Sequence, residues 1–140
     1  MLIVYKVVIL NYFLWAKLSY IPVHYIYLNR LAHHNSLTLT SFVDLPRALA
    51  LLDRLPSACA IILAACGPHL CVGIDLSSLY SITASSSVDR AAAGELLRHR
   101  TLALQVVVSV VEQCRKLVVE AIHDAYIGDG VDLVAAYNMW

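Results

Sequence analysis

The chain is short, apolar and balanced in charge: 140 residues, 60% of them hydrophobic and 14% charged, with ten basic and ten acidic side chains. The balance argues against a nucleic-acid-binding protein, which needs a basic excess, and the apolar content excludes a disordered chain. We therefore expect one small domain. Ordinary soluble domains are roughly 45–50% apolar, so the excess predicts either a membrane segment or part of a larger fold.

The first twenty residues are the most apolar part of the chain. Lys6 and Lys17 leave only residues 7–16 between them, whereas a membrane-spanning helix needs about 20 apolar residues. The length suits a signal-peptide core, but no small-residue cleavage site follows. Val, Ile, Tyr, Phe and Trp dominate, which predicts a strand. We treat residues 1–22 as a separate apolar segment and residues 23–140 as the domain.

The next part of the chain reads as strand, helix and strand. Val23–Leu28 is rich in β-favouring residues. Ser36 or Thr38 can cap a helix, and Pro46 should kink that helix or mark its true start. Ala58–Ala64 is a continuous apolar run, typical of a strand covered on both faces. Apolar residues recur in the helix at three- and four-residue spacing, namely Phe42, Leu45, Leu49 and Leu52.

The second half alternates again between polar and apolar segments. The serine-rich residues 77–87 predict a mobile surface loop. Asp89 can cap a long helix over Ala91–Lys116, although its run of valines leaves helix and strand both open there. Leu117–Ile122 predicts a buried strand, and Val131 begins a last helix. The predicted fold class is α/β, in the order β-β-α-β-α-β-α.

Neither the cysteines nor the histidines form a metal-binding pattern. The four cysteines contain no C-x-x-C pair, so we expect reduced, mostly buried thiols in the cytosol or an organelle matrix. The neighbouring His33 and His34 point away from each other on a helix or strand, so we expect no metal site. The cysteines are Cys59, Cys66, Cys71 and Cys114.

Two segments place a glycine turn directly after an apolar strand, namely Ile61–Asp75 and Val118–Asp132. Backbone N–H groups at such turns attract negative charge. One donor from each turn, aimed at the same point, makes an oxyanion hole. On spacing alone, two ordinary tight connections are the favoured explanation of the pattern.

The residues of these segments carry a resemblance. Cys-Val-Gly-Ile-Asp-Leu at 71–76 is followed by Ile-Gly-Asp-Gly-Val-Asp-Leu at 127–133, and both are preceded by Asn29-Arg30 and by Asn-Ser-Leu at 35–37. Together they resemble the crotonase (enoyl-CoA hydratase/isomerase) superfamily over roughly residues 23–138. Hydratases of that superfamily usually have Glu at the Asp132 position, whereas Gly-Val-Asp-Leu is similar to the dienoyl-CoA isomerases.

The resemblance implies a truncated crotonase-like core, a spiral of ββα units. It also implies proton transfer beside a thioester carbonyl, converting a 3,5-dienoyl-CoA of fatty-acid β-oxidation to the 2,4 isomer. By matching motif, the oxyanion donors are the backbone N–H groups of Ile74 and Asp129, and Asp132 is a catalytic acid/base. Val72, Gly73 and Ile74 would contact CoA. Neither a metal nor a cofactor is implied, since CoA is part of the substrate.

The resemblance also sets expectations about activity, partners and location. The partners would be an acyl-CoA thioester and other copies of the chain or its relatives, with no nucleic acid and no membrane. The location would be the peroxisome or mitochondrion, although the last residues are not a Ser-Lys-Leu type signal. The family's remaining carboxylates come after the position of Trp140, so we expect little or no isomerase activity from this chain alone. The alternatives are a non-catalytic acyl-CoA-binding or hetero-oligomerising fragment and a small membrane-anchored protein.

The chain departs from the family pattern at two glycine positions, which hold Asp124 and Asp129. Glycine permits backbone geometry that aspartate tolerates poorly, and a carboxylate beside an oxyanion would repel it. Besides Asp132, the carboxylates that remain as substitutes for those the family has further on are Glu112, Glu120 and Asp124. We expect each to be solvated or to lie at a strand edge.

Overall fold

All the described strands belong to one sheet. The computed structural model describes residues 4–10, 13–18, 21–83, 90–128, 131 and 135. The strands are β1 (Val4–Leu10), β2 (Phe13–Leu18), β3 (Val23–Leu28), β4 (Ala60–Ala65) and β5 (Leu117–Glu120). The helices are the 3₁₀ turn η1 (Leu31–His33), α1 (Ser41–Arg54), α2 (Leu76–Thr83) and α3 (Arg90–Gln113).

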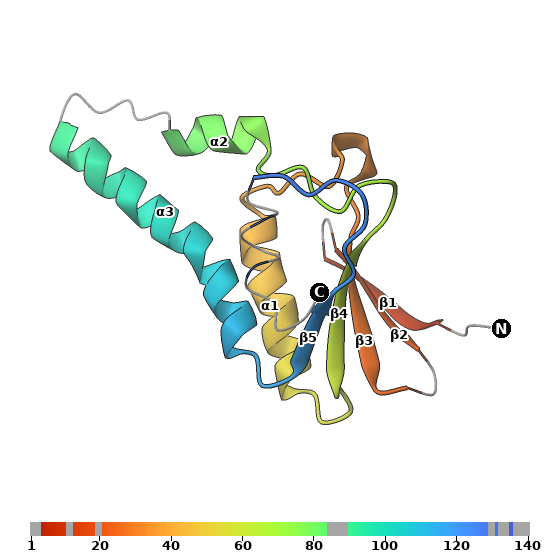
Figure 1. The fold of residues 1–140 in the computed structure, drawn as a ribbon. Helices are drawn as coiled ribbons and strands as arrows, with labels where there is room; N and C mark the ends of the chain where they lie inside the picture. Colours follow the sequence, from red (N-terminus) through yellow and green to blue (C-terminus); the bar gives the residue numbers. More distant parts are fainter. Residues whose placement is uncertain are drawn as a thin grey trace.

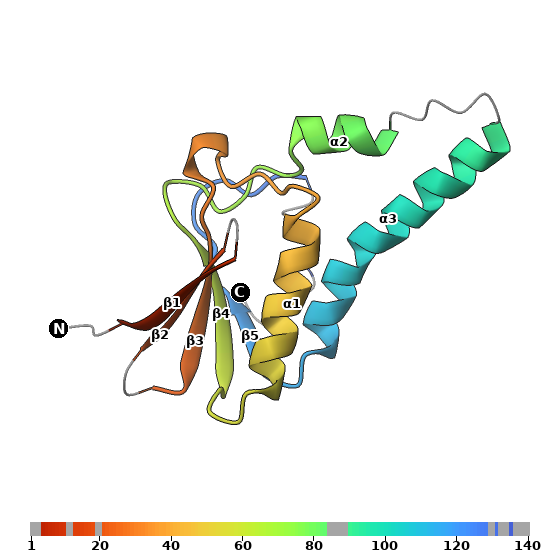
Figure 2. The same ribbon diagram turned by 180° about the vertical axis from the view of Figure 1, so that it is seen from behind.

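The strands lie in the spatial order β1-β2-β3-β4-β5. The first three are antiparallel neighbours, whereas β3, β4 and β5 are parallel. Figure 1 shows α1 against one face of the sheet and α3 on the far side of α1. Figure 2 shows the same layers from behind, with α2 beyond the ends of the strands and the beginning of α3 extending away from the sheet. The carboxyl ends of the parallel strands therefore meet at one edge, next to α2.

The core lies between the parallel strands and α1. Alternate residues of β3 are buried, and Ile26 pairs in register with Leu63 of β4. Ile61 of β4 in turn pairs with Val118 of β5, and both side chains are fully buried. From α1, one face packs against this layer at helical spacing, with Leu45, Ala48, Leu49 and Leu52 buried.

The structure confirms the α/β class and most of the predicted elements. The strand predicted at Val23–Leu28 has those bounds, and the apolar run at 58–64 forms β4 with a start two residues later. The described part of the first twenty residues, 4–10 and 13–18, is β-structured as predicted, but it forms two strands, both in the same sheet as β3. The strand predicted to reach Ile122 ends at Glu120. Of the last predicted helix, Val131 and Ala135 are helical, and most of it lies outside the described residues.

The start of α1 differs from the prediction. Its N-cap residue is Thr40, and Pro46 lies inside the helix instead of beginning it. Thr38 nevertheless contributes to this end, because its hydroxyl accepts a hydrogen bond from the Ser41 N–H at 3.2 Å. The Ser41 hydroxyl accepts one from the Thr38 N–H at the same distance, so the two side chains close the turn reciprocally.

The prediction of a loop over residues 77–87 was wrong for its first part, because residues 76–83 form α2. The Asp75 carboxylate caps this helix: its Oδ1 accepts hydrogen bonds from the N–H groups of Ser77, at 3.1 Å, and Ser78, at 3.3 Å. A cap of this kind satisfies N–H groups that the helix itself leaves unpaired. Residues 84–89, including the predicted cap Asp89, lie outside the described residues.

The valine-rich segment is helical, but α3 ends at Gln113, so Arg115 and Lys116 lie beyond it. Arg115 is instead fastened to α1. Its backbone N–H donates to Asp53 Oδ1 at 2.9 Å, and its guanidinium Nε donates to Oδ2 at 3.0 Å. This pair ties the start of β5 to the end of α1, at the edge of the sheet opposite α2 (Figure 1).

The cysteine prediction was confirmed in part. All four thiols are free, but only Cys71 is buried, and Cys59 is exposed. Among the described residues, no three His, Cys, Asp or Glu side chains form a group suited to a metal ion. Nor does any helix in the described part of the chain combine the length and apolarity needed to cross a membrane.

Two leucines of α1 provide a matched test of the core. Leu49 is 1% exposed and Leu51 is 66% exposed. We expect Leu49→Ala to lower the free energy of unfolding by about 2–5 kcal/mol, because it removes buried apolar surface and leaves a cavity. Leu51→Ala should change it by no more than about 0.5 kcal/mol. Urea denaturation of both variants checks this, and equal effects would contradict the assignment of the buried face.

Candidate functional site

The two turns that the sequence predicts to converge lie side by side. Cys71 forms a parallel bridge with Tyr126, and the Ile127 N–H donates to the Cys71 carbonyl at 3.0 Å. A Cβ atom added to Gly128 would lie 3.6 Å from the Cα of Gly73, so the two backbones are in van der Waals contact. The turn after β4 and the turn after β5 are therefore in direct contact.

Gly73 is the residue that permits this approach. Its φ is +94°, in the region that favours glycine, and an added Cβ would lie 3.0 Å from the Ile127 carbonyl oxygen. A side chain at this position would both strain the backbone and push the second turn away. Glycine is therefore required here by conformation and by space.

The backbone N–H of Ile74 is the donor that this turn presents. The Gly73 carbonyl accepts a hydrogen bond from the Leu37 N–H at 2.8 Å. Because a trans peptide is planar, its C=O and N–H point in opposite directions, so the Ile74 N–H is directed away from residue 37. No described residue accepts a hydrogen bond from it. An oxyanion site requires N–H donors that point in a fixed direction and have no hydrogen-bond partner within the protein.

The three residues predicted to contact CoA are consecutive in the same loop. Val72 and Ile74 are half-buried, and Gly73 between them is buried. The structure thus places them beside the converging turns, and their contact with CoA stays a prediction.

Of residues 128–133 in the second turn, the structure describes Gly128 and Val131. Gly128 has a φ of +59°, and its carbonyl accepts a hydrogen bond from the Val131 N–H at 2.8 Å, which closes a turn. Asp129 and Asp132 lie outside the described residues. Their roles as oxyanion donor and acid/base stay predictions.

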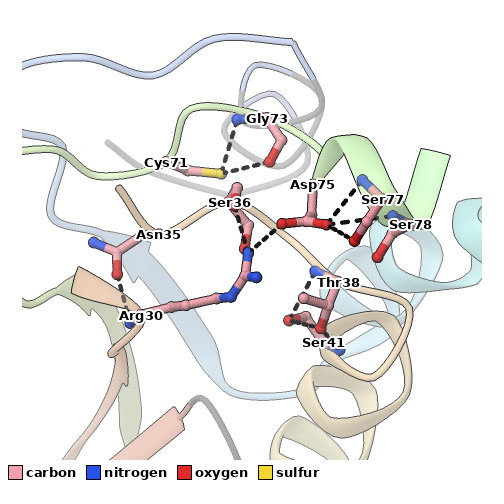
Figure 3. Close-up of polar contacts among 10 residues, drawn as sticks. All are labelled: Arg30, Asn35, Ser36, Thr38, Ser41, Cys71, Gly73, Asp75, Ser77 and Ser78. Carbon is pink, nitrogen blue, oxygen red and sulfur yellow. Dashed lines mark hydrogen bonds and ion pairs between the residues drawn. The ribbon is translucent and has the colours of Figure 1, made fainter. Parts of the chain in front are cut away.

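A network of polar side chains lies between the end of β3, the start of α1 and the start of α2 (Figure 3). Arg30 Nη1 donates to the Ser36 hydroxyl at 2.6 Å and to Asp75 Oδ2 at 2.7 Å. Ser77 and then Arg30 hold the pKa of the Asp75 carboxyl well below its usual range by hydrogen bonding. Asp75 therefore stays ionised throughout the physiological range.

Asn35 holds the other end of this network. Its Oδ1 accepts a hydrogen bond from the Arg30 N–H at 2.8 Å, and its Nδ2 donates to the carbonyls of Cys66 and His69 at 2.9 and 2.8 Å. The side chain is buried and the backbone is left-handed, with a φ of +57°. Asn35 thereby fixes the loop that leads from β4 into the Gly73 turn.

Arg30, Asn35 and Asp75 each belong to a sequence motif, but the motifs do not indicate that these residues share a task. One signal was available. Apart from histidines, Arg30 is the only charged residue between Lys17 and Asp44, and Asp75 is the only one between Arg54 and Asp89. Isolated opposite charges in apolar stretches are candidates for a buried pair.

Comparison with known proteins decides the family. Residues 20–138 match the Enoyl-CoA hydratase/isomerase family. The chain belongs to this family. It is 46% identical over 119 residues to the peroxisomal Delta(3,5)-Delta(2,4)-dienoyl-CoA isomerase of Arabidopsis thaliana, covering 84% of this chain and 43% of that protein. The mitochondrial enzyme of the same name from Mus musculus is 30% identical over 116 residues, covering 82% and 36%.

Solved structures of the family share the fold. An enoyl-CoA hydratase/isomerase from Marinobacter aquaeolei superposes with a TM-score of 0.80 at 19% identity, covering 92% of this chain and 47% of that one. The enoyl-CoA hydratase from Bacillus anthracis gives 0.74 at 24% identity, covering 91% and 46%. The chain thus spans less than half the length of the relatives it matches.

Asp124, which the resemblance places at a glycine position, has a backbone conformation that favours glycine. Its φ is +52°, in the left-handed region. The side chain is 60% exposed, and its Oδ2 lies 2.5 Å from Nδ1 of His69. A close contact with the preceding loop therefore accompanies the left-handed backbone of Asp124.

The three remaining carboxylates were expected to be solvated or to lie at a strand edge. This is correct for the exposed Glu112 and Asp124. Glu120 does lie on the edge strand β5, but it is 2% exposed, and both carboxylate oxygens lack a hydrogen-bond partner among the described residues. Burial raises the pKa of Glu120 to about 8, because removal from water disfavours the charged form.

The raised pKa of Glu120 predicts that the stability of the chain depends on pH. The folded chain keeps this proton up to about pH 8, whereas the unfolded chain releases it near the ordinary value of 4.5. The folded state thus binds more protons between these values, and the free energy of unfolding should fall as the pH rises through this window. Glu120→Gln, which stays neutral, should remove this contribution and be more stable than the native chain by at least about 1 kcal/mol at pH 8.

Urea denaturation from pH 5 to pH 8 measures this effect. The exposed carboxylate Glu112 supplies the control, since Glu112→Gln should leave the native pH profile unchanged. If Glu120→Gln and the native chain lose stability in parallel as the pH rises, Glu120 is not the group responsible.

Proposed function

We propose that this chain forms the thioester-activating part of a dienoyl-CoA isomerase site. The observation that carries the proposal is the direction of the Ile74 N–H, which points away from Leu37 without a partner among the described residues. The Gly73 turn holds it against the turn after β5. The 46% identity to a plant dienoyl-CoA isomerase supports the choice of reaction.

The chemistry follows from what an oxyanion donor does. A 3,5-dienoyl thioester loses a proton from C2, the electron pair is delocalised over the thioester oxygen and the diene as far as C6, and protonation at C6 gives the 2,4-dienoyl isomer. Backbone N–H groups lower the barrier by stabilising the negative oxygen. In this proposal the donors are Ile74 and Asp129, and Asp132 carries the C2 proton. The chemistry uses no metal and no resident cofactor.

Turnover by these 140 residues alone is expected to be small, since Asp132 is the one acid/base carboxylate that the family motif assigns within them. Proton removal and return at C2 need only one base, whereas net isomerisation also needs an acid at C6. We therefore expect exchange at C2 to exceed isomerisation. The named relatives are peroxisomal and mitochondrial, and we propose one of these compartments for this chain.

Exchange in heavy water tests the proposal. Incubated with a 3,5-dienoyl-CoA in D₂O, the native chain should incorporate deuterium at C2, measured by mass spectrometry, with little 2,4-dienoyl product by absorbance. Asp132→Asn should lower the exchange rate by about 10²–10⁴-fold, the usual contribution of a positioned acid/base. Glu112→Gln, which removes an exposed carboxylate, should not change it. Exchange that is absent, or that is equal in Asp132→Asn, would overturn the proposal.

A further inference from the structure

The peptide that presents the Ile74 N–H is held in place by the backbone of a single residue. Leu37 donates its N–H to the Gly73 carbonyl and accepts the Asp75 N–H at its own carbonyl, both at 2.8 Å. These two bonds lie on either side of Ile74. Whatever fixes residue 37 relative to residue 75 therefore fixes the direction of the Ile74 N–H as well.

One guanidinium nitrogen makes that connection. Arg30 Nη1 contacts both the hydroxyl and the carbonyl of Ser36, at 2.6 and 3.3 Å, and Oδ2 of Asp75, at 2.7 Å (Figure 3). Ser36 directly precedes Leu37, and Asp75 directly follows Ile74. The Arg30 side chain thus connects the segment that contains Leu37 to the segment that contains Ile74, next to the point where these two residues pair.

The ion pair is sheltered from solvent, which makes it more than a surface contact. The side chains of Arg30 and Asp75 are 14% and 12% exposed. Charged hydrogen bonds are short and strong in such surroundings, whereas most exposed ion pairs contribute little. The partners are 45 residues apart in the sequence, so the pair joins the end of β3 to the start of α2.

The two oxygens of Asp75 divide its tasks. Oδ1 accepts the hydrogen bonds from Ser77 and Ser78 that cap α2, and Oδ2 accepts the one from Arg30. Capping alone therefore does not account for the second oxygen. Asparagine caps helices as well as aspartate does, so Asp75→Asn can keep the cap while placing an N–H₂ group where Arg30 needs an acceptor.

We propose that Arg30 and Asp75 are positioning residues for the Ile74 N–H, and that their ion pair sets how well this site recognises the carbonyl of an acyl-CoA thioester. The inference rests on the proposed function. The pair does not touch the thioester. It acts through residues 36 and 37 on the peptide that does.

Two ligands distinguish an effect on the position of the Ile74 N–H from a general loss of binding. One is a 2,4-dienoyl-CoA with a ¹³C-labelled thioester carbonyl, and the other is the thioether analogue, which lacks that carbonyl. In the native chain, hydrogen bonding should lower the carbonyl stretching frequency measured by infrared difference spectroscopy. In Asp75→Asn the frequency should return toward that of the free thioester, and the dissociation constant for the thioester should rise about tenfold, as for one lost hydrogen bond. The thioether should bind with unchanged affinity.

The Arg115–Asp53 pair supplies the matched control. It also joins distant segments through an arginine and an aspartate, at 2.9 Å, but at the opposite edge of the sheet. Asp53→Asn should leave both affinities and the carbonyl frequency as in the native chain.

Three results would overturn the inference. Native frequency and affinity in Asp75→Asn would show that the ion pair does not position the donor. Equal weakening of the thioester and the thioether would show a general loss of the binding site. If the native chain binds neither ligand, the proposed function is wrong and this inference fails with it. That outcome is distinct from the other two because it appears in the native chain itself.

Discussion

The orientation of the peptide between Gly73 and Ile74 is the constraint on which the site depends. Its carbonyl is committed to Leu37 at 2.8 Å, and planarity then directs its N–H the other way. The φ of +94° at Gly73 makes this orientation accessible, and the backbone of Ile127 leaves no room for a side chain there. Sterics, planarity and one hydrogen bond thus determine the direction of the Ile74 N–H, the donor that we propose for a negative oxygen.

The fold supplies this constraint by bringing strand ends together. Because β3, β4 and β5 are parallel, the loops that follow them leave from the same edge of the sheet. Buried side chains such as Ile61 and Val118 hold those strands in register. The polar network from Arg30 to Asp75 then joins the loops to one another. The apolar core thus positions the strands, and the Arg30–Asp75 ion pair holds together the loops that follow them.

Local patterns were sufficient for much of this arrangement. The bounds of β3 could be predicted from residue types and spacing, whereas the convergence of the two glycine turns followed from the family resemblance. The helix α2 could not, because serines favour loops and its cap comes from Asp75, whose place is set by Arg30, 45 residues earlier. The burial of Glu120 was missed for a similar reason, since charge predicts exposure until packing decides otherwise. The spacing of apolar residues along the sequence does not indicate which distant residues will be in contact.

The long helix α3 makes the stability of the molecule uneven along the chain. Of its described side chains, only Val111, near the end that meets α1, is buried. Its earlier turns extend away from the sheet (Figure 2). Local opening costs little free energy where few apolar contacts are lost. Amide protons should thus exchange fastest in the first turns of α3 and progressively more slowly toward Gln113, while the β-sheet beneath α1 exchanges only through global unfolding.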